Sequence, residues 1–460
     1  MANTKLNRTA GSTGNRRTWT FSAWVKRSAV KGTADSKGGL FSTYTDGNNR
    51  LDFGIDANDR FFFKEKESSS TLIDFTSHRT FQDPASFYNF VIAVDTTQVT
   101  EANRIKIYCN NEQITSWLDS TYPSVNRDTL MNVSGRTYII GSTDGSSNYW
   151  NGVMSHVNFS DGYAYTPSTF GSTDTNGNWK INTAPSITMG TNGFSILKDG
   201  DTITDQSTNS NDFTLGGGTL TKTLDCPSNN FATWNVLAPQ GNNRTMGNGN
   251  TYIGVNSNNS WNCLYATLAP TSGKFYCEIK DESDWGSTSD STRRYGIVDL
   301  NASIDMNRAS ATDVRFSDHN YAYAYMNASG VRHSGSTLSG TTSTHPTFAE
   351  GNIIMIAMDL DNHKLYFGKN GTWNNSADPT SGATGTGSVA NIDADGMWTF
   401  YAETKYGSDN ASANFGNGFH RTTAVTTNSG NGYAGAEGKS KFTYQPPTGY
   451  SALTTLGMNQ

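Results

Sequence analysis

Apolar and polar residues alternate with a period of two through most of the chain. In the segment 18–25, Trp19, Phe21 and Val25 fall on one face of an extended backbone, and Thr18 and Thr20 fall on the other. This alternation predicts strands that bury one face against a core. Clusters of Gly, Asn, Asp and Ser separate the strand-like runs, as expected for turns, and no segment keeps a helical period. Further runs in the first half cover residues 51–55, 60–64, 90–94, 104–109, 137–140 and 153–159.

The second half repeats this plan. The run 91–95 followed by 104–108 is similar to the run 355–359 followed by 363–367. Many short strands at regular spacing indicate β-sandwiches, and the internal similarity indicates two related ones. We therefore predict an all-β fold of two tandem antiparallel jelly-roll β-sandwiches, residues 1–187 and 230–460, with a connecting segment of weak periodicity over 188–229. The strand-like runs of the second half cover residues 274–279, 294–300, 321–326, 352–359, 364–367, 397–403 and 412–415.

The composition indicates a folded protein in spite of its polarity. Of the 460 residues, only 16% are charged and 34% are hydrophobic, while 46 are Gly. Aromatic residues nevertheless make up 12% of the chain, which is too many for a disordered chain that builds no core. A chain of this length has room for two large β domains.

Charge and run length exclude several classes of function. The net charge is −6 and at most two basic residues are adjacent, so the sequence lacks the basic face of a nucleic-acid-binding protein. The apolar runs are strand-sized, so we expect no membrane insertion, and the N-terminus shows no signal peptide. The four Cys residues lie far apart, which favours buried thiols in a protein synthesised in a cytoplasm over disulfides or zinc.

The sequence also lacks the common catalytic motifs. Its seven His residues are scattered singly, and HExxH, GxSxG and P-loop patterns are missing. We therefore expect a protein without enzyme activity and assign no catalytic residues.

Two groups of motifs resemble known families. Residues 15–180 resemble the laminin-G-like, concanavalin A-like lectin/glucanase module. Residues 230–457 resemble a SPRY domain, most specifically in the run 359–373, which reads DLDNHKLYFGKNGTW. Both families are antiparallel jelly rolls. The order of the two modules is similar to that in structural proteins of tailed bacteriophages, especially marine phages such as cyanophages. The supporting runs are 21–26, 88–95, 104–110, 140–142 and 149–157 for the first module and 273–279 and 295–298 for the second.

The resemblance implies a homo-oligomeric component of a virion surface, with three alternative roles. The first is a non-enzymatic protein at the tail, as a knob or fibre, whose lectin-like modules contact a host glycan or receptor. The second is a capsid or tail decoration protein that contacts only other virion proteins. The third, a glycan-degrading enzyme, is disfavoured because Lys280 occupies the middle carboxylate position of the glucanase pattern and Glu278 is interpreted as a structural strand residue. The lack of a coiled-coil shaft favours a compact knob or decoration over a fibre.

Aromatic side chains near turns are the candidate binding residues. Sugars present C–H faces to aromatic rings and hydroxyls to Asn, Asp and Arg side chains. Tyr321, Tyr323 and Tyr325 alternate on one strand face, where core packing is the plainer interpretation. We expect exposure and ligand binding for Tyr149, Trp150, Trp261, Trp285, Arg293 and Arg294.

One segment resembles the first half of a calcium loop. Asn391, Asp393 and Asp395 place oxygen ligands at alternate positions before Gly396, so calcium is the one cofactor that the sequence suggests. The carboxylate expected at the twelfth position is missing, because Ala402 stands there. A turn in which Asn, Asp and Gly shape the backbone is the alternative interpretation.

Overall fold

The chain forms two compact units. The first contains residues 1–222 and 226–228, and the second contains residues 223–225 and 229–460. Both consist almost entirely of antiparallel sheets, so the predicted all-β fold class is confirmed. Within the ranges described here, no helix has the length and apolar character that crossing a bilayer requires. The computed structural model describes residues 3–31, 36–198, 202–238, 244–255, 261–283, 292–302, 315–426 and 432–459.

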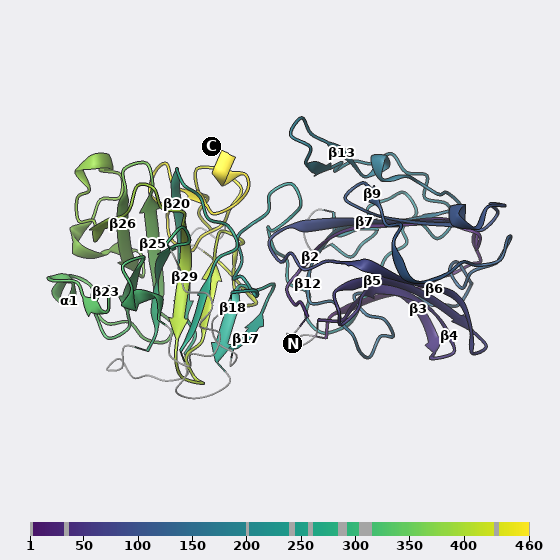
Figure 1. Ribbon diagram of the computed structural model, residues 1–460, viewed down its shortest axis with the longest axis horizontal. Helices are drawn as coiled ribbons and strands as arrows, with labels where there is room; N and C mark the ends of the chain where they lie inside the picture. Colours follow the sequence, from purple (N-terminus) through teal and green to yellow (C-terminus); the bar gives the residue numbers. More distant parts are fainter. Residues whose placement is uncertain are drawn as a thin grey trace. The chain divides into compact units, whose positions relative to one another are not determined.

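The first unit is a sandwich of two sheets, and Figure 1 shows the layer with β2, β7 and β12 against the layer with β3, β4, β5 and β6. The larger sheet has the strand order β10 (Trp117–Thr121), β6 (Ser70–Thr80), β5 (Arg60–Glu67), β4 (Asn49–Ile55), β3 (Gly38–Asp46), β11 (Thr137–Ile140), β1 (Lys5–Thr9) and β16 (Thr214–Gly217). The smaller sheet has the order β15 (Phe194–Ile196), β12 (Gly152–Asp161), β2 (Thr18–Arg27), β7 (Phe87–Asp95), β8 (Ile105–Cys109) and β9 (Glu112–Gln113).

Alternate side chains of β2 fill the space between these sheets. Trp19, Phe21 and Val25 are fully buried, so the predicted inward face is confirmed. The Phe21 ring stacks on that of Phe41 in β3, with 5.1 Å between the centroids. Full burial of each such side chain contributes roughly 2–3 kcal/mol. The period-two pattern therefore builds the core of the sandwich directly.

The segment 188–222 belongs to this sandwich, although the sequence predicted a connecting segment over 188–229. β15 pairs with β12, and β16 pairs with β1. Phe194 and Phe213 are buried, and their ring centroids are 4.7 Å apart. The boundary at 187 was wrong because strands of three and four residues contain too few alternations to be recognised.

A hairpin of β13 (Gly171–Thr173) and β14 (Trp179–Ile181) lies on the outer side of the smaller sheet, beyond β7 and β9 in Figure 1. Trp179 Nε1 donates to Asn89 Oδ1 at 3.1 Å. Asn89 lies opposite Trp24 in the β2–β7 register, on the face turned away from the core. Polar residues on this face thus fasten the hairpin to the sheet.

The second unit is also a sandwich. The larger sheet has the order β17 (Arg244–Gly247), β18 (Tyr252–Val255), β30 (Ala411–Asn414), β20 (Lys274–Asp281), β25 (Ile353–Asp359), β26 (Lys364–Lys369) and β27 (Thr372–Trp373), with β28 (Ala390–Asn391) on β26 and β33 (Ser451–Ala452) on β20. The smaller sheet has the order β19 (Asn262–Tyr265), β29 (Trp398–Thr404), β21 (Arg294–Asp299), β22 (Ala322–Met326), β23 (Val331–His333) and β24 (Ser336–Thr337). The connections of this unit hold the hairpin of β31 (Phe419–His420) and β32 (Thr423–Ala424), helix α1 (Thr341–Thr344) and 3-10 turns at Phe316–Asp318, Asn374–Ser376, Gly382–Thr384 and Gly457–Asn459. The first unit has 3-10 turns at Glu101–Asn103 and Pro167–Thr169.

A buried carboxylate fastens the C-terminal segment to the larger sheet of the second unit. Glu278 of β20 is 0% exposed. Its Oε1 accepts from the backbone N–H of Tyr444 at 2.7 Å, and its Oε2 accepts from that of Thr443 at 2.9 Å. Asn414 Nδ2 donates to Oε2 at 3.3 Å. A buried carboxylate requires such donors, so Glu278 has the structural role expected from the sequence.

The cysteines keep their thiols. Cys109, Cys263 and Cys277 are buried, as expected, whereas Cys226 is only partly buried. Burial raises the pKa of Cys109 to about 12. This thiol is therefore protonated and unreactive at neutral pH.

Candidate functional site

Three neighbouring strands of the second unit, β22, β21 and β29, place polar and aromatic side chains at one end of the core. Ile297 of β21 lies in the core between the two sheets. Two residues further along, a row across the three strands consists of Tyr321, Asp299 and Trp398. Side chains two residues apart share a face of the sheet. This row therefore lies on the inner face, where it closes the end of the core.

A pocket with a volume of about 350 Å³ lies over this row. Its other wall comes from the segment 391–393, which continues from β28 on the edge of the opposite sheet. The pocket is thus an opening between the two layers of the sandwich. It is lined by Asp299, Ala302, Asn320, Tyr321, Tyr323, Asn391, Ile392, Asp393 and Trp398.

Three aromatic rings form the apolar part of the pocket. Tyr321 and Tyr323 are partly buried, and Trp398 is 2% exposed. The centroids of Tyr323 and Trp398 lie 6.1 Å apart with 39° between the ring planes. A histidine stacks on each tyrosine, His333 on Tyr323 at 4.1 Å and His319 on Tyr321 at 5.0 Å. Because these stacks already order the tyrosine rings, the two tyrosine side chains lose little conformational entropy when a ligand binds.

Asp299 places a carboxylate among these rings, although it is only 7% exposed. Its Oδ1 accepts from the backbone N–H of Met397 at 2.8 Å and from that of Asn301 at 2.9 Å. Among the described residues, Asp299 Oδ2 receives no hydrogen bond, and this side chain lines the pocket. This oxygen is not shut off from solvent, so a donor that enters the pocket can reach it. The arrangement therefore offers a charged acceptor to a ligand.

Asp393 lies in a turn on the opposite wall. Trp398 Nε1 donates to the backbone carbonyl of Asp393 at 2.9 Å, and the backbone N–H of Asp395 donates to Asp393 Oδ1 at 3.1 Å. Burial raises the pKa of Tyr323, and the negative charge of Asp393 raises it further. This carboxylate therefore acts on the same space as the tyrosine hydroxyl.

The candidate calcium ligands make the contacts of a turn. Asn391 Oδ1 accepts from Lys364 Nζ at 2.5 Å, and Asp393 and Asp395 are exposed. In the part of the chain that the structure describes, no three His, Cys, Asp or Glu side chains come together so as to hold a metal ion. Calcium at Asn391, Asp393 and Asp395 stays a prediction.

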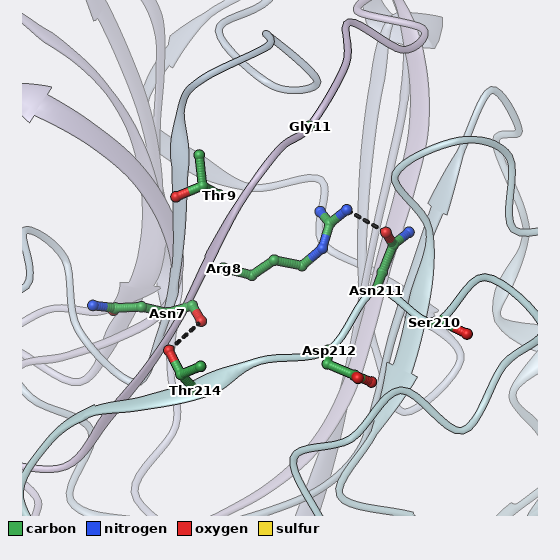
Figure 2. A pocket seen from close by; sticks show the side chains of 8 residues that line it. All are labelled: Asn7, Arg8, Thr9, Gly11, Ser210, Asn211, Asp212 and Thr214. Carbon is green, nitrogen blue, oxygen red and sulfur yellow. Dashed lines mark hydrogen bonds between the residues drawn. The ribbon is translucent and has the colours of Figure 1, made fainter.

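The first unit contains a pocket of about 430 Å³ with a different character. Figure 2 shows Arg8 extending across it from β1 and donating through Nη2 to Asn211 Oδ1 in the loop before β16. Thr214 Oγ1 donates to the backbone carbonyl of Asn7 at 3.2 Å. The Arg8 guanidinium lies 5.7 Å from the ring centroid of buried Tyr138. The described side chains that line this pocket are polar, and no aromatic ring is among them.

Three predicted ligand-binding residues are buried, so their predicted exposure was wrong. Trp261 is 6% exposed, and the Arg294 guanidinium covers its ring at 4.3 Å. Arg293 is 1% exposed, and its Nε donates to Asp281 Oδ2 at 2.8 Å. Arg294 is 3% exposed, and its Nη1 donates to Glu403 Oε2 at 3.3 Å. Adjacent arginines suggested a surface because only the folded chain shows that Asp281, 12 residues from Arg293, and Glu403, 109 residues from Arg294, lie beside them.

The remaining predicted residues lie outside both pockets or outside the described chain. Tyr149 and Trp150, in the loop before β12, are partly buried. Trp150 packs against the core of the first unit, and Tyr149 Oη donates to the Gly145 carbonyl at 3.3 Å. Trp285 lies outside the described residues. Ligand binding by Tyr149, Trp150 and Trp285 stays a prediction.

The three alternating tyrosines divide between the core and the pocket. Tyr325 is 0% exposed and donates to the Pro346 carbonyl at 2.5 Å, so core packing is confirmed for it. Tyr321 and Tyr323 pack against the same core and also line the pocket.

Asp299 and Trp398 were missed by the sequence analysis. A signal for Asp299 was present, because Tyr295, Ile297 and Asp299 alternate and so place a carboxylate on the inner face of a strand. Trp398 carried no such signal, since an aromatic residue on an inner face is ordinary core.

Comparison with known proteins bears mainly on the first unit. Residues 3–169 match the Laminin_G_3 family model, described as the Concanavalin A-like lectin/glucanases superfamily. No curated protein matches the chain significantly.

Solved structures of several kinds are similar to parts of the chain. The SPRY domain of human HERC1 is 15% identical, with 39% of this chain and 96% of that chain covered and a TM-score of 0.29. Domain 4 of AbnA, an extracellular arabinanase from Geobacillus stearothermophilus in complex with arabinotriose, is 15% identical, with 34% and 65% covered and a TM-score of 0.24. A SAP-like pentraxin from Limulus polyphemus is 13% identical, with 41% and 89% covered and a TM-score of 0.28. Residues 3–169 are thus similar to the concanavalin A-like lectin/glucanase superfamily, and a second β-sandwich unit follows the first in the chain.

Proposed function

We propose that the protein binds carbohydrate without transforming it, through the pocket at the open end of the second sandwich. The observation that carries this proposal is the meeting of the Tyr321 and Tyr323 rings with the incompletely satisfied carboxylate of Asp299. Concanavalin A-like lectin domains such as that of the first unit commonly bind carbohydrate or protein, which supports a binding role for the chain.

The pocket has the two kinds of surface that a sugar ring needs. The C–H face of a pyranose packs on tyrosine rings, and its hydroxyls donate to carboxylates. Asp299 Oδ2 and the Asp393 carboxylate supply acceptors, and Asn320 supplies an amide with both donors and an acceptor. A volume of about 350 Å³ is at the lower end for small-molecule sites. The pocket therefore suits one or two saccharide units rather than a long chain.

A glycan array with the full chain, followed by calorimetric titration of the saccharides that bind, tests the proposal. Tyr321→Ala removes a stacking face, and we expect affinity to fall about tenfold. Asp299→Asn keeps the acceptor for the two backbone N–H groups but loses the charge, and we expect a fall of about tenfold or more. Tyr163→Ala is the matched control, because Tyr163 is a 45% exposed tyrosine of the first unit. Absence of any bound glycan, or unchanged binding by Tyr321→Ala, would refute the proposal.

Binding without hydrolysis is a separate part of the proposal. Asp299 and Asp393 both line the pocket, and glycosidases use paired carboxylates. We expect a bound oligosaccharide to be recovered intact after prolonged incubation, as judged by its reducing ends and its mass. Release of reducing sugar that disappears in Asp299→Asn and Asp393→Asn would show an enzyme instead.

For the biological setting, we propose a homo-oligomeric protein on the surface of a phage virion, at the tail or as a knob, that contacts host glycans. The support is the order of lectin-like and SPRY-like modules in the sequence. The alternative is a decoration protein that contacts only other virion proteins. Proteomics and electron microscopy of virions from phages whose genomes encode the chain distinguish the adhesion protein from the decoration protein. A location at the tail together with glycan binding supports adhesion. A capsid-lattice position without glycan binding supports decoration, and absence from virions contradicts both.

A further inference from the structure

We infer that the pocket of the second unit prefers saccharides that carry a positively charged amine and disfavours those that carry a carboxylate or sulfate. This inference rests on the proposed function, because it treats the pocket as a glycan site and specifies the class of glycan. It follows from the charges, the rings and the one open carboxylate oxygen of the pocket.

The lining of the pocket is acidic. The described residues that line it include Asp299 and Asp393 and no Lys or Arg. Lys364 lies close by, but its Nζ donates to Asn391 Oδ1 at 2.5 Å rather than to either carboxylate. An ammonium group in the pocket would gain the attraction of two carboxylates, and an anionic group would meet their repulsion.

The buried carboxylate defines where the ammonium would bind. Asp299 is 7% exposed, and its Oδ1 already accepts two backbone N–H groups from Met397 and Asn301. Among the described residues, nothing donates to its Oδ2. An ammonium carries three N–H donors and a positive charge, so it satisfies this oxygen more completely than a hydroxyl does.

The aromatic rings favour the same ligand. Tyr321 and Trp398 flank Asp299 in one row, and Tyr323 lies 6.1 Å from Trp398 between ring centroids. Ring faces carry negative electrostatic potential and attract cations. Tyr321 and Tyr323 are the rings that a ligand can reach, because Trp398 is only 2% exposed. They repel carboxylate and sulfate groups for the same reason. Carboxylates and rings together therefore select positive charge.

The first test uses the full chain and two small probes of equal shape. Choline carries a permanent positive charge, and 3,3-dimethylbutanol is its neutral counterpart. The charge of neither probe therefore changes with pH. Binding is followed through the indole N–H signal of Trp398, which Trp398→Phe identifies. We expect choline to bind about tenfold more tightly than the alcohol, with a difference that shrinks in high salt.

Matched variants show whether the charge preference comes from these carboxylates. The double variant Asp299→Asn with Asp393→Asn should abolish the difference between the probes. Glu350→Gln removes an exposed carboxylate of the same unit that does not line this pocket, and it should leave the difference unchanged. An equal response to both probes, or a preference that survives the double variant, overturns the inference.

The second test takes the saccharide found on the array and compares three forms with the same linkage: an amino sugar, its neutral hydroxyl parent and the uronic acid. We expect the amino form to bind about tenfold more tightly than the parent, and the uronic acid to bind about tenfold more weakly. If the neutral sugar binds and the amino form binds no better, the charge preference is wrong and the proposed function stands. If no saccharide of any charge binds, both are wrong.

Discussion

Two buried carboxylates of the second unit differ in their surroundings. Both oxygens of Glu278 accept hydrogen bonds from the backbone or from side chains. Asp299 satisfies one oxygen and directs the other to a pocket. Both side chains are buried, at 0% and 7% exposure, so burial alone does not distinguish their roles. The donors around each oxygen distinguish a structural carboxylate from a binding one.

Glu278→Ala should destabilise the second unit by about 3–5 kcal/mol, because the backbone N–H groups of Thr443 and Tyr444 lose their acceptor. Denaturant unfolding of the full chain measures this loss. Glu282→Gln is the control, since Glu282 is partly exposed and its Oε1 accepts from Ser412 Oγ at 2.8 Å. We expect less than about 1 kcal/mol for it. A similar loss in both variants would contradict the structural role of Glu278.

Trp398→Phe should weaken ligand binding with only a modest effect on stability. The indole N–H of Trp398 donates to the Asp393 carbonyl at 2.9 Å and so holds the turn that carries one pocket carboxylate. Phenylalanine keeps most of the buried apolar surface but lacks this donor, and we expect about 1–2 kcal/mol of destabilisation. Binding should fall more than in Asp395→Asn, which leaves the Trp398 hydrogen bond in place. Equal affinities in the two variants would show that the turn needs no such support.

Among the structural elements, long central strands were predictable and short edge strands were not. The ten residues of β2 contain enough alternations to identify both faces, and the inward face was confirmed. β15 and β16 have three and four residues, and only pairing with β12 and β1 shows that they are strands. The arrangement of the folded strands also decides whether Arg293 and Arg294 are buried beside carboxylates or exposed to solvent. The candidate pocket was missed for the same reason, because its two walls come from opposite sheets.

A chain that ends at residue 187 should fail to fold stably, whereas one that ends at residue 222 should fold as the first sandwich. The shorter chain lacks Phe194 and Phe213, which are buried against each other at 4.7 Å between ring centroids. Loss of each such phenylalanine costs about 3–5 kcal/mol. Thermal unfolding of both chains provides the measurement. Phe213→Ala in the longer chain should lower its free energy of unfolding by the amount expected for the loss of one phenylalanine. A cooperative transition in the shorter chain would restore the boundary at 187.

In the molecule as a whole, the buried groups with the largest pKa shifts predict opposite pH responses for the two units, although burial also raises the pKa of Asp281 in the second unit. In the first unit, burial raises the pKa of Glu65 to about 7 and that of Asp52 to about 6. Protons that these carboxyls hold in the folded state are released on unfolding, so their contribution to stability is lost as pH rises from about 4.5 to 7. In the second unit, burial lowers the pKa of His345 to about 4. Its contribution is complete above about pH 6.5 and is lost as pH falls toward 4.

Acidification from pH 7.5 to 5 should therefore stabilise the first unit by up to about 4 kcal/mol, and the protonation of His345 should destabilise the second by up to about 2 kcal/mol. Calorimetry of the full chain across this range should show the two unfolding transitions moving in opposite directions. Glu65→Gln should flatten the response of the first unit, although it weakens the contact with Arg127. His345→Phe should flatten that of the second, because His345 Nε2 is buried without a partner and its ring packs on Tyr325. Transitions that move together, or that keep their slopes in these variants, would show that other groups govern the response. This pH range also affects the binding experiments. Near pH 5, a fall in apparent affinity would combine weaker ligand binding with unfolding of the unit that contains the pocket.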